Sequence, residues 1–584
     1  MALERLFDSL FIQKEKFPQK TALAAKENGI WQSYSTEVFV QIVNELSNGL
    51  LQLGVKPGDK IGLVSYNRPE WVFADMAISQ IGAIDVPMYP NSTTEDYSFI
   101  ISHAGIKLIF CGDLAIYDKL KSTSFDDSSI YTFDVLDRVK HWKSILTPCD
   151  ESSLARIEKL KGAITKKDLA TIIYTSGTTG EPKGVMLSHD NIMSNAQAVA
   201  QVISSIKPGM KTLSFLPLSH TFERTGLYTY MHMGISIYYA ESIETIADNL
   251  KEVQPHFFAT VPRLLEKVYD KIVKKGYELT GIKKQLFFWA LHLGQQFDLE
   301  KKQGWWYDTQ MKLASRLIFS KWREALGGNI EFVVSGGAAL QPRLATIFWA
   351  AGIRILEAYG LTETSPGVSF SRDDSIKIGT VGPLLDKVQV KIADDGEVLV
   401  KGPNVMMGYY KNEQATKAVI TTDGWFHTGD IGEMVDDTFL KITDRKKEMF
   451  KTSGGKYIAP QLLENSLKES MLIEQVMVIG ENKRFPGALI VPSFESLKDW
   501  CELHDIAYTT DAEILENEKV LAKFQSELDH CNRTYAQYEK VKRFKLLDVA
   551  WTVEAGELTA KLSMKRRVIL ERNQQAVEEI YAHE

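Results

Sequence analysis

The densest group of side chains that could do chemistry lies between residues 174 and 183, in the string Tyr-Thr-Ser-Gly-Thr-Thr-Gly-Glu-Pro-Lys. Glycine lets a backbone turn sharply and approach a ligand closely. Hydroxyl groups and backbone amides can donate hydrogen bonds to phosphate oxygens, and Lys183 adds a positive charge. The apolar, β-branched runs at 169–173 and 185–189 suit strands. We therefore expect a β-hairpin whose tip holds a polyphosphate.

This loop is not a Walker loop. The Walker motif needs Gly-x-x-x-x-Gly-Lys-[Ser/Thr] running into a helix. Here Gly177 and Gly180 are only three residues apart, and Lys183 is followed by Gly184. A threonine- and glycine-rich loop taken alone is more often a solvent-exposed hairpin, but the full string with Pro-Lys-Gly is far more specific.

The full string resembles the phosphate loop of the adenylate-forming superfamily, which contains acyl-CoA synthetases, luciferases and the adenylation domains of peptide synthetases. At least six strings in this chain resemble motifs of that superfamily, in its order, and together they cover nearly the whole chain. The resemblance implies that the loop binds the phosphates of ATP. The expected contacts are Thr175, Ser176, Gly177, Thr178, Thr179, Gly180 and Lys183.

A second string, Leu-Pro-Leu-Ser-His-Thr-Phe-Glu-Arg at 216–224, contains His220. A lone histidine is more often a structural residue than a functional one. This string resembles the Leu-Pro-Leu-x-His-x-Phe-Glu-Arg segment of long-chain acyl-CoA synthetases. The resemblance implies that His220 lies beside the carboxylate to be activated and that the following segment borders an acyl tunnel.

Two further strings resemble the nucleotide-binding segments of the superfamily. The run at 333–339 predicts a strand that ends in glycines, and such a turn lets backbone approach a flat ring. The resemblance implies that 357–363 lies along adenine, that Thr362 reaches phosphate and that Glu363 binds Mg²⁺, for which a carboxylate is a suitable hard ligand. The expected nucleotide contacts here are Gly336, Gly337, Glu357, Ala358, Tyr359, Gly360 and Thr362.

Later motifs are similar to the ribose and CoA segments of the superfamily. The string at 423–430 resembles Gly-Trp-x-x-Thr-Gly-Asp, which implies that Asp430 accepts hydrogen bonds from both ribose hydroxyls. The resemblance also makes Arg445 a ribose contact and Asp444 the hinge between two domains. It places Lys451 and the Gly-rich run at 453–456 in the region that turns toward the CoA arm.

The tail departs from the superfamily pattern. Members carry a tail lysine that grips the carboxylate and the α-phosphate during adenylation, but aligned on Arg566 without a gap, Ser563 stands at its position. Lys561 and Lys565 lie two residues to either side, and residues two apart share a face of an extended segment. We favour Lys561 as the adenylation lysine. The alternative is that adenylation is weakened or lost.

The order of the expected elements gives the fold class. With 584 residues the chain is too long for one core. A helix at 37–53, strands from 61 and 84 and a helix at 70–81 alternate, which favours a wound, mainly parallel sheet. We expect a large wound α/β N-terminal domain over 1–443 and a smaller mobile α+β lid over 444–584. The polar stretch at 121–168 is interpreted as a connecting region.

The segment at about 263–326 is helical in pattern, aromatic and rich in lysine, and it resembles an insertion of long-chain synthetases. It suits helices packed on the large domain or a peripheral membrane contact.

The net charge of −7 argues against nucleic acid as the main partner. The cysteines at 111, 149, 501 and 531 lack metal-like spacing and are typical of reduced thiols in the cytoplasm. No signal peptide or membrane-spanning run is predicted.

The resemblance implies an AMP-forming long-chain fatty acid–CoA ligase. ATP and a fatty acid give an acyl-adenylate and pyrophosphate, and CoA then gives acyl-CoA and AMP. Lys183, His220, Glu363 and Lys561 are the expected catalytic residues. Three alternatives remain: an acyl-adenylate ligase for shorter or aryl acids, a kinase-like NTPase, and a weakly active protein that binds nucleotides or acyl groups.

Overall fold

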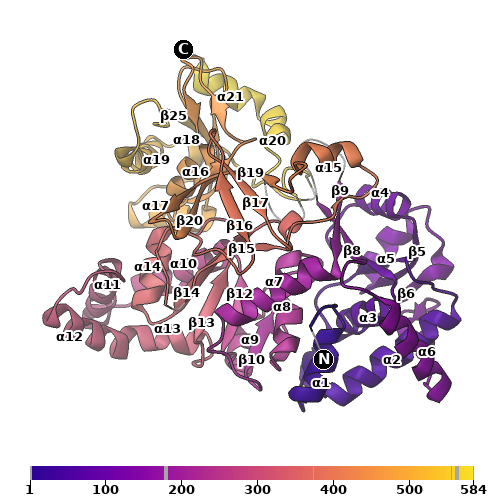
Figure 1. Cartoon of the computed structure of the whole chain (residues 1–584). Coiled ribbons are helices and arrows are strands. Elements are labelled where there is room, and N and C mark those ends of the chain that lie inside the picture. Colours follow the sequence, from indigo (N-terminus) through magenta and orange to yellow (C-terminus); the bar gives the residue numbers. More distant parts are fainter. Residues whose placement is uncertain (1–2, 176–181, 373, 554, 560–563, 583–584) are drawn as a thin grey trace. The chain divides into compact units, whose positions relative to one another are not determined.

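The computed structural model describes residues 3–175, 182–372, 374–553, 555–559 and 564–582, and it divides into two compact units (Figure 1). The first comprises Met1–Lys391, Leu399–His427 and Val435–Leu440, and the second comprises Ile392–Val398, Thr428–Met434 and Lys441–Glu584. The chain enters the second unit for the last time at Lys441, close to the expected boundary. The hinge at Asp444 itself remains a prediction.

One sheet of the first unit carries the phosphate-loop hairpin. Its strands, in spatial order, are β18 (Gly408–Tyr409), β9 (Lys183–Ser188), β8 (Leu169–Thr175), β4 (Ile84–Met88), β3 (Lys60–Val64), β5 (Ile106–Cys111), β6 (Ile130–Thr132) and β7 (Lys140–His141). The strands β8, β4, β3, β5, β6 and β7 run parallel to one another. Strand β9 pairs antiparallel with both of its neighbours, β8 and β18. Helices α2 (Thr36–Gln52), α3 (Pro69–Gln80), α4 (Thr94–Ala104) and α5 (Leu114–Lys121) connect or cover these strands.

A second sheet of the same unit carries the nucleotide segments. Its order is β15 (Gly367–Phe370), β14 (Arg354–Gly360), β13 (Phe332–Ser335), β12 (Phe257–Thr260), β10 (Lys211–Ser214), β11 (Ser236–Tyr239), β1 (Leu23–Glu27) and β2 (Ile30–Tyr34). Only the edge strands β15 and β2 pair antiparallel in this described sheet. Helices α1 (Asp8–Lys16), α7 (His189–Val202), α8 (Thr221–His232), α9 (Ile246–Val253) and α14 (Pro342–Ala350) accompany it. The wound, mainly parallel α/β architecture is confirmed, with two such sheets instead of one.

The first helices show how the sequence builds this core. In α2 the side chains of Phe39, Val43, Leu46 and Leu50 repeat at helical spacing and are fully buried. Each such burial stabilises the fold by about 1.5–3 kcal/mol. All residues of α3 are buried, since this helix is apolar on most sides and lies in the interior of the unit.

The stretch at 121–168 is not a mere connection, so that interpretation was wrong. It contains β6, β7 and the helix α6 (Glu151–Ala163), which begins with a capping box at Asp150. Several of its apolar residues, among them Ile130, Trp142 and Ile157, are buried. The strands are too short to show a period in the sequence, which is why composition alone suggested a linker.

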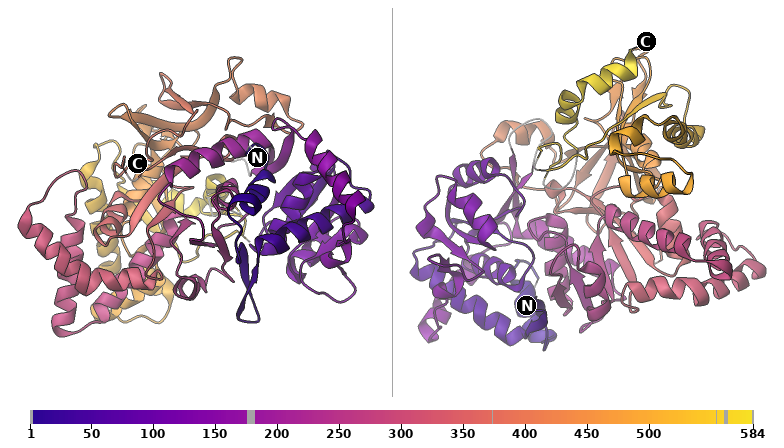
Figure 2. Two further views of the ribbon diagram at one scale, coloured as in Figure 1. Left: turned by 60° about the horizontal axis from the view of Figure 1, so that its bottom comes forward. Right: turned by 180° about the vertical axis from the view of Figure 1, so that it is seen from behind.

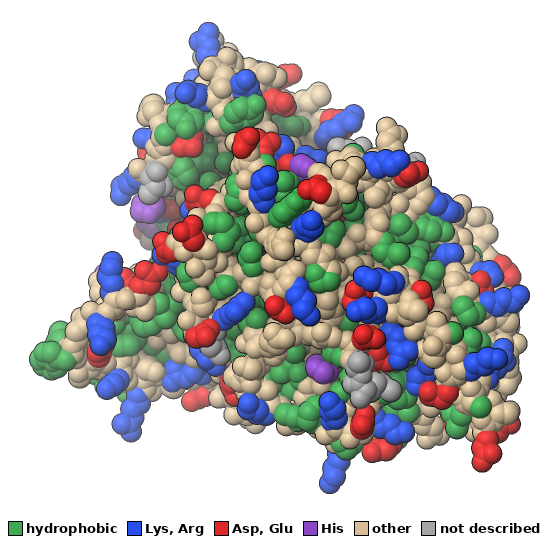
Figure 3. All heavy atoms as spheres, in the orientation of Figure 1, with side chains coloured by type: hydrophobic (Ala, Val, Ile, Leu, Met, Phe, Trp, Pro, Cys, Tyr) green, Lys and Arg blue, Asp and Glu red, His purple; other side chains and the backbone are tan. Residues whose placement is uncertain are grey.

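The aromatic insertion is helical, as expected. It consists of α10 (Pro262–Glu278), α11 (Gly281–Gln295), α12 (Trp305–Ala314), the π-helical turn η3 (Ser315–Phe319) and α13 (Ser320–Ala325). Phe287, Phe319 and Trp322 are buried, and Trp322 contacts Phe348 of α14. Helices α11 and α12 lie at the periphery of the unit, away from its sheets (Figures 1 and 2). Hydrophobic and basic side chains are exposed there (Figure 3).

The second unit is α+β. The residues Ile392–Val398, Thr428–Met434 and 441–445 of this unit belong to the sheet of β16 (Gln389–Ile392), β17 (Glu397–Lys401), β19 (Phe426–Val435) and β20 (Phe439–Arg445), whose remaining residues are counted with the first unit. The strands that lie wholly in the second unit are β21 (Phe450–Lys451) with β22 (Tyr457–Ile458), and β23 (Ile473–Ile479), β24 (Gly487–Pro492) and β25 (Arg543–Leu546) in a further sheet. Its helices are α16 (Pro460–Leu467), α17 (Phe494–Leu503), α18 (Asp511–Glu516), α19 (Glu518–Cys531), α20 (Arg566–Arg572) and α21 (Gln574–Tyr581). Apolar residues pack on both faces of the β23–β24–β25 sheet. Among the described helices of either unit, none is long and apolar enough to cross a membrane.

Candidate nucleotide and acyl site

The arms of the predicted phosphate-loop hairpin are present. Strands β8 and β9 pair antiparallel, and their last described pair before the tip joins Thr175 to Lys183. The arms form strands because their β-branched residues, such as Ile172 and Ile173, are buried in the sheet. The predicted phosphate contacts Ser176, Gly177, Thr178, Thr179 and Gly180 lie outside the described residues.

Lys183 and the predicted magnesium ligand Glu363 meet at one tyrosine. The Lys183 Nζ atom lies 5.1 Å from the centre of the Tyr409 ring. The Tyr409 hydroxyl donates to Glu363 Oε1 at 3.0 Å. Burial raises the pKa of Tyr409, and the neighbouring Glu363 raises it further, so this hydroxyl remains a donor. Tyr409 escaped the sequence analysis, because only the pairing of β18 with β9 brings it here.

The residues around Glu363 fit a magnesium ion that is held mainly by substrate. Among the described residues there is no group of three or more His, Cys, Asp or Glu side chains able to hold a metal. Mg²⁺ is commonly bound by one or two carboxylates together with substrate phosphates. The half-buried Glu363, next to the arm that carries Lys183, offers one such carboxylate.

A narrow cavity of about 60 Å³ brings His220 together with the nucleotide segments. The residues from those segments that line it are Gly336, Gly337, Ala358, Tyr359 and Gly360. Apolar side chains also line it, among them Val199, Ile203, Phe257 and Val334. Ligand sites commonly combine such apolar side chains with a few polar groups.

The backbone of the nucleotide segments leaves no room for larger residues. A Cβ atom on Gly360 would lie 1.7 Å from the carbonyl oxygen of Pro366. A Cβ atom on Gly336 would lie 3.1 Å from the Phe222 ring, which also lines the cavity. Gly337 adopts a φ of 81°, in the left-handed region that favours glycine. Close packing at Gly360 and Gly336 and the backbone conformation at Gly337 therefore favour glycine at these positions.

His220 is positioned by the start of helix α8. It is the N-cap residue, and its Nδ1 atom accepts a hydrogen bond from the backbone N–H of Phe222 at 3.1 Å. An imidazole that accepts at Nδ1 carries its proton on Nε2 when neutral. His220 can therefore offer an N–H group to a carboxylate oxygen while its ring orientation is fixed by the helix.

A buried charge cluster anchors the same helix. The Arg224 guanidinium contacts Asp75 at 2.5 Å and Asp85 at 2.7 Å, and it donates to Thr171 and to Tyr228 at 2.8 Å each. Burial raises the pKa of Asp85 well above its usual range, although Arg224 opposes this shift. Arg224 is thus enclosed by two buried carboxyl groups and two hydroxyls.

This cluster explains the Phe-Glu-Arg part of the motif in structural terms. Thr171 belongs to β8, the strand that leads to Thr175 and the phosphate loop. The backbone N–H of Arg224 donates to His220 O at 3.1 Å. Arg224 thus joins the strand of the phosphate loop to the helix that carries His220, and it acts by positioning them.

Glu357 behaves differently from its neighbours in the nucleotide segment. Its side chain does not line the cavity; it is buried and accepts a hydrogen bond from the backbone of Leu340. Burial raises the pKa of Glu357 to about 8. Thr362 is also buried, at the start of the 3₁₀ turn Thr362–Thr364 that presents Glu363.

In the second unit, the two predicted ribose contacts lie near each other. The Arg445 Nε atom is 3.7 Å from Asp430 Oδ1. The adjacent Asp444 is buried, and burial raises its pKa to about 7. Lys451 is exposed, and its Nζ atom lies 5.4 Å from the centre of the Tyr457 ring.

The predicted adenylation lysine, Lys561, lies outside the described residues, as does Ser563. The flanks of this stretch are described. Leu558 and Met564 form an antiparallel β-bridge, and the backbone N–H of Lys565 donates to Glu557 O at 2.8 Å.

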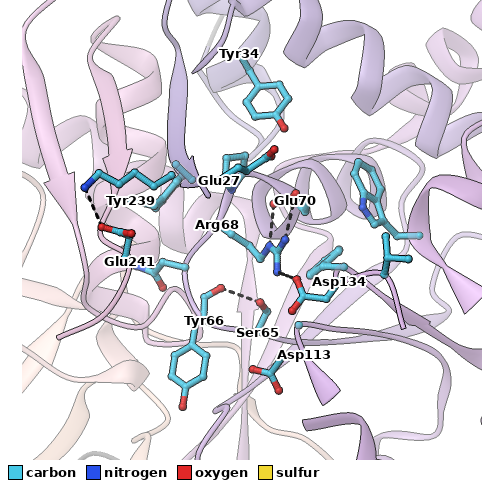
Figure 4. Close-up of a pocket in the computed structure, with 18 of the residues that line it drawn as sticks. Glu27, Tyr34, Ser65, Tyr66, Arg68, Glu70, Asp113, Asp134, Tyr239 and Glu241 are labelled. Atoms are coloured by element: carbon cyan, nitrogen blue, oxygen red, sulfur yellow. Dashed lines mark hydrogen bonds and ion pairs between the residues drawn. The ribbon is translucent and has the colours of Figure 1, made fainter. Parts of the chain in front are cut away.

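A larger cleft of about 720 Å³ lies at the carboxyl ends of strands from both sheets of the first unit, a usual place for ligands (Figure 4). Its charged lining residues are Lys26, Glu27, Arg68, Glu70, Asp113, Asp134, Lys143 and Glu241. Arg68 contacts Glu70 at 2.9 Å and Asp134 at 2.7 Å, and Lys26 contacts Glu241 at 3.0 Å. Because carboxylates outnumber cations here, the cleft disfavours a polyphosphate.

Comparison with known proteins agrees with this geometry. Residues 10–410 match the family described as AMP-binding enzyme, and residues 448–584 match the AMP-binding enzyme C-terminal domain. The chain is 33% identical over 570 residues to the long-chain-fatty-acid–CoA ligase FadD15 of Mycobacterium bovis, covering 95% of this chain and 94% of the relative. It is 31% identical to long chain acyl-CoA synthetase 4 of Arabidopsis thaliana, with 99% and 92% covered.

The fold is similar to that of solved enzymes of this kind. The crystal structure of the anthranilate CoA ligase AuaEII in complex with anthranoyl-AMP matches with a TM-score of 0.72 and 18% identity, over 99% of this chain and 98% of that one. The match extends through both units. By its sequence motifs, its cavity and these matches, the chain belongs to the AMP-binding enzyme family.

Proposed function

We propose that this protein is an AMP-forming ligase that joins a long-chain fatty acid to CoA through an acyl-adenylate. The observation that carries the proposal is the cavity at which His220 and the nucleotide segments meet apolar side chains. The names of the relatives, long-chain ligases and synthetases, support the choice of acid. ATP and CoA are the co-substrates.

In the first half-reaction, a carboxylate oxygen of the acid attacks the α-phosphorus of ATP, and pyrophosphate leaves. Negative charge gathers between the carboxylate and the α-phosphate, so the protein must supply positive charge and N–H donors there. Lys183 provides charge at the phosphate-loop hairpin, and His220 Nε2–H can donate to the carboxylate. Mg²⁺ held by Glu363 would supply a Lewis-acidic charge on the phosphate oxygens.

In the second half-reaction, the CoA thiolate attacks the acyl carbon of the adenylate, and AMP leaves. Both nucleophiles come from substrates, so no serine or cysteine nucleophile is required. Asp430 and Arg445 would hold the ribose. A rotation of the second unit about Asp444 would withdraw the tail lysine and bring the run at 453–456 toward CoA.

The flanks of the tail support Lys561 as the adenylation lysine. The bridge between Leu558 and Met564 leaves five residues between its ends, and Lys561 is the middle one. Lys565 lies beyond the bridge, where its backbone N–H donates to Glu557 O and the residue stands directly before α20. The backbone of Lys565 is therefore held at the start of a helix, which favours Lys561 for the role.

A second candidate function is ligation of shorter acids, and the small cavity favours it. The cavity has a volume of only about 60 Å³. The Tyr230 side chain lines the cavity and packs over Gly226, where an added Cβ atom would lie 2.8 Å from its hydroxyl. A long chain would require Tyr230 or its neighbours to move.

Chain-length selectivity separates the two candidates. Each methylene transferred from water into the cavity is worth about 0.8 kcal/mol, about a four-fold gain in kcat/KM. For a long-chain ligase, kcat/KM for pyrophosphate release should climb steadily from short acids to palmitate. A maximum at short or aryl acids would favour the second candidate.

We also propose that the protein works in the cytoplasm and contacts membranes from outside the bilayer. Its cysteines are free thiols, which suits a reducing compartment. A peripheral contact suits the substrate, because long acyl chains partition into bilayers.

A further inference from the structure

Two neighbouring tryptophans are exposed on the helical insertion. All eleven tryptophans of the chain lie in the described ranges, and only Trp305 and Trp306 among them are exposed, at 76% and 62%. Their ring centres are 5.5 Å apart at the start of α12. Large aromatic side chains are seldom left this open to water, and a group of them marks a surface that another molecule covers.

The tryptophans continue into a regular helical face. Leu313 follows Trp306 by seven residues and Leu317 follows by eleven, so these exposed side chains lie on one side of the helix. Lys312 and Arg316 follow Trp305 by the same intervals and form a neighbouring basic stripe. We define the docking face as Trp305, Trp306, Lys312, Leu313, Arg316 and Leu317.

The rest of α12 holds this face outward. On the other side of the helix, the Tyr307 hydroxyl donates to Leu293 O of α11 at 2.9 Å, and Ala314 is buried. Trp289 of α11 donates to Gln310 at 3.4 Å. Hydrophobic side chains gather over α11 and α12, with lysines and arginines around them (Figure 3). The face is therefore presented by a packed helix pair.

Charge identifies the kind of surface that would cover it. The segment 262–326 contains thirteen Lys and Arg against seven Asp and Glu, a net charge of +6, although the whole chain carries −7. A helix with tryptophan and leucine on one stripe and basic residues beside it is typical of contact with the headgroup region of a bilayer. Anionic lipids attract such a segment through each basic side chain. A second copy of this positively charged segment would instead be repelled.

We propose that the docking face binds the surface of an anionic lipid bilayer, with Trp305 and Trp306 at the headgroup–acyl boundary and Lys312 and Arg316 at lipid phosphates. The inference rests on this surface and not on the proposed ligase activity. It would bring the enzyme to the phase in which a long-chain acid is most concentrated.

Vesicle co-sedimentation of the full chain tests the proposal. The protein should bind vesicles of phosphatidylcholine with about one-third phosphatidylserine, bind vesicles of phosphatidylcholine alone more weakly, and lose binding as salt screens the charges. The double variant Trp305→Ala/Trp306→Ala should lower the affinity for anionic vesicles at least about ten-fold, because both aromatic anchors are removed. Lys312→Glu/Arg316→Glu should lower it at least about twenty-fold, at about five-fold per lost positive charge.

Matched controls separate docking from folding and from catalysis. Leu503→Ala/Tyr538→Ala removes exposed apolar side chains of the second unit and should leave vesicle binding unchanged. Each variant should keep the pyrophosphate release of the unmodified chain with a water-soluble acid. The proposal is overturned if the unmodified protein does not bind anionic vesicles, or if the control variant loses as much vesicle binding as the tryptophan variant. It is also overturned if the tryptophan substitutions abolish self-association of the protein and leave vesicle binding unchanged. If the unmodified chain binds vesicles but has no ligase activity, the proposal for the docking face stands and the proposed function is refuted.

Discussion

At the scale of single residues, the proposed site offers few charged side chains to the several phosphate groups of ATP. Glu363 is fixed by the Tyr409 hydroxyl, and Lys183 lies over the same ring. We propose that the Glu363 carboxylate holds Mg²⁺ together with substrate oxygens, so that its charge serves the first half-reaction.

Glu363→Gln should therefore lower pyrophosphate release at limiting Mg²⁺ by at least about one hundred-fold, because it keeps the side-chain shape but removes the charge. The measurement is coupled pyrophosphate detection over a Mg²⁺ titration, with the thermal midpoint as a check on folding. Tyr409→Phe is the matched variant and should cost less, since the carboxylate remains. Unchanged release by Glu363→Gln would remove Glu363 from the site.

Asp444 gives the second unit a pH dependence of stability. Burial raises its pKa from 3.8 to about 7 in the folded protein. Between these values the folded state binds the proton that the unfolded state has released, so this residue makes the free energy of unfolding fall as pH rises toward about 7. Above that pH both states are ionised, and the full cost of the buried charge persists.

Asp444→Asn removes this cost. The variant should gain stability relative to the unmodified chain between about pH 4 and about pH 7 and hold that gain at higher pH. Urea unfolding of both proteins across this range measures the difference. A difference that does not change with pH would show that Asp444 ionises normally in the fold.

At the scale of elements, a buried ion pair holds together the two pieces that carry the chemistry. Arg224 links α8, which begins at His220, to β8, which leads to the phosphate loop. Breaking such a pair from one side leaves a carboxylate buried without its cation.

Arg224→Met should lower the free energy of unfolding by about 3–5 kcal/mol, because Asp75 is left without its cation. Lys417→Met, which removes an exposed partner of Glu413, should cost less than about 1 kcal/mol. Denaturant unfolding curves compare the two. Equal small effects would show that the contacts of Arg224 with α8 and β8 contribute little to the free energy of unfolding.

Some helices and strands could be predicted from the sequence and others could not. The hairpin arms, α2 and the helical insertion could be predicted because their apolar residues repeat over several turns or strand positions. The strands between 121 and 168 could not, since two or three residues cannot display a period. Tyr409 was missed because its place beside Glu363 arises from strand pairing far along the chain. The burial of the Glu357 side chain could not be predicted either, while its contact with the nucleotide stays a prediction.

At the scale of the whole molecule, the proposed rotation of the second unit about Asp444 would let the tail lysine act only in the first half-reaction. Lys561→Ala should slow acyl-adenylate formation by orders of magnitude while leaving the conversion of pre-made acyl-adenylate and CoA to thioester intact. Lys565→Ala is the matched control and should retain both steps. An adenylation-only defect in Lys565→Ala would reverse the assignment, and loss of both steps in Lys561→Ala would indicate a misfolded tail.

Ligation through an acyl-adenylate is tested directly by a two-stage reaction of the unmodified chain with palmitate, ATP and Mg²⁺, followed by addition of CoA. We expect palmitoyl-adenylate and pyrophosphate to form in equal amounts before CoA is added. Palmitoyl-CoA and AMP should then form in equal amounts as the adenylate disappears. Release of ADP and phosphate, or pyrophosphate release that does not depend on the acid, would contradict this mechanism.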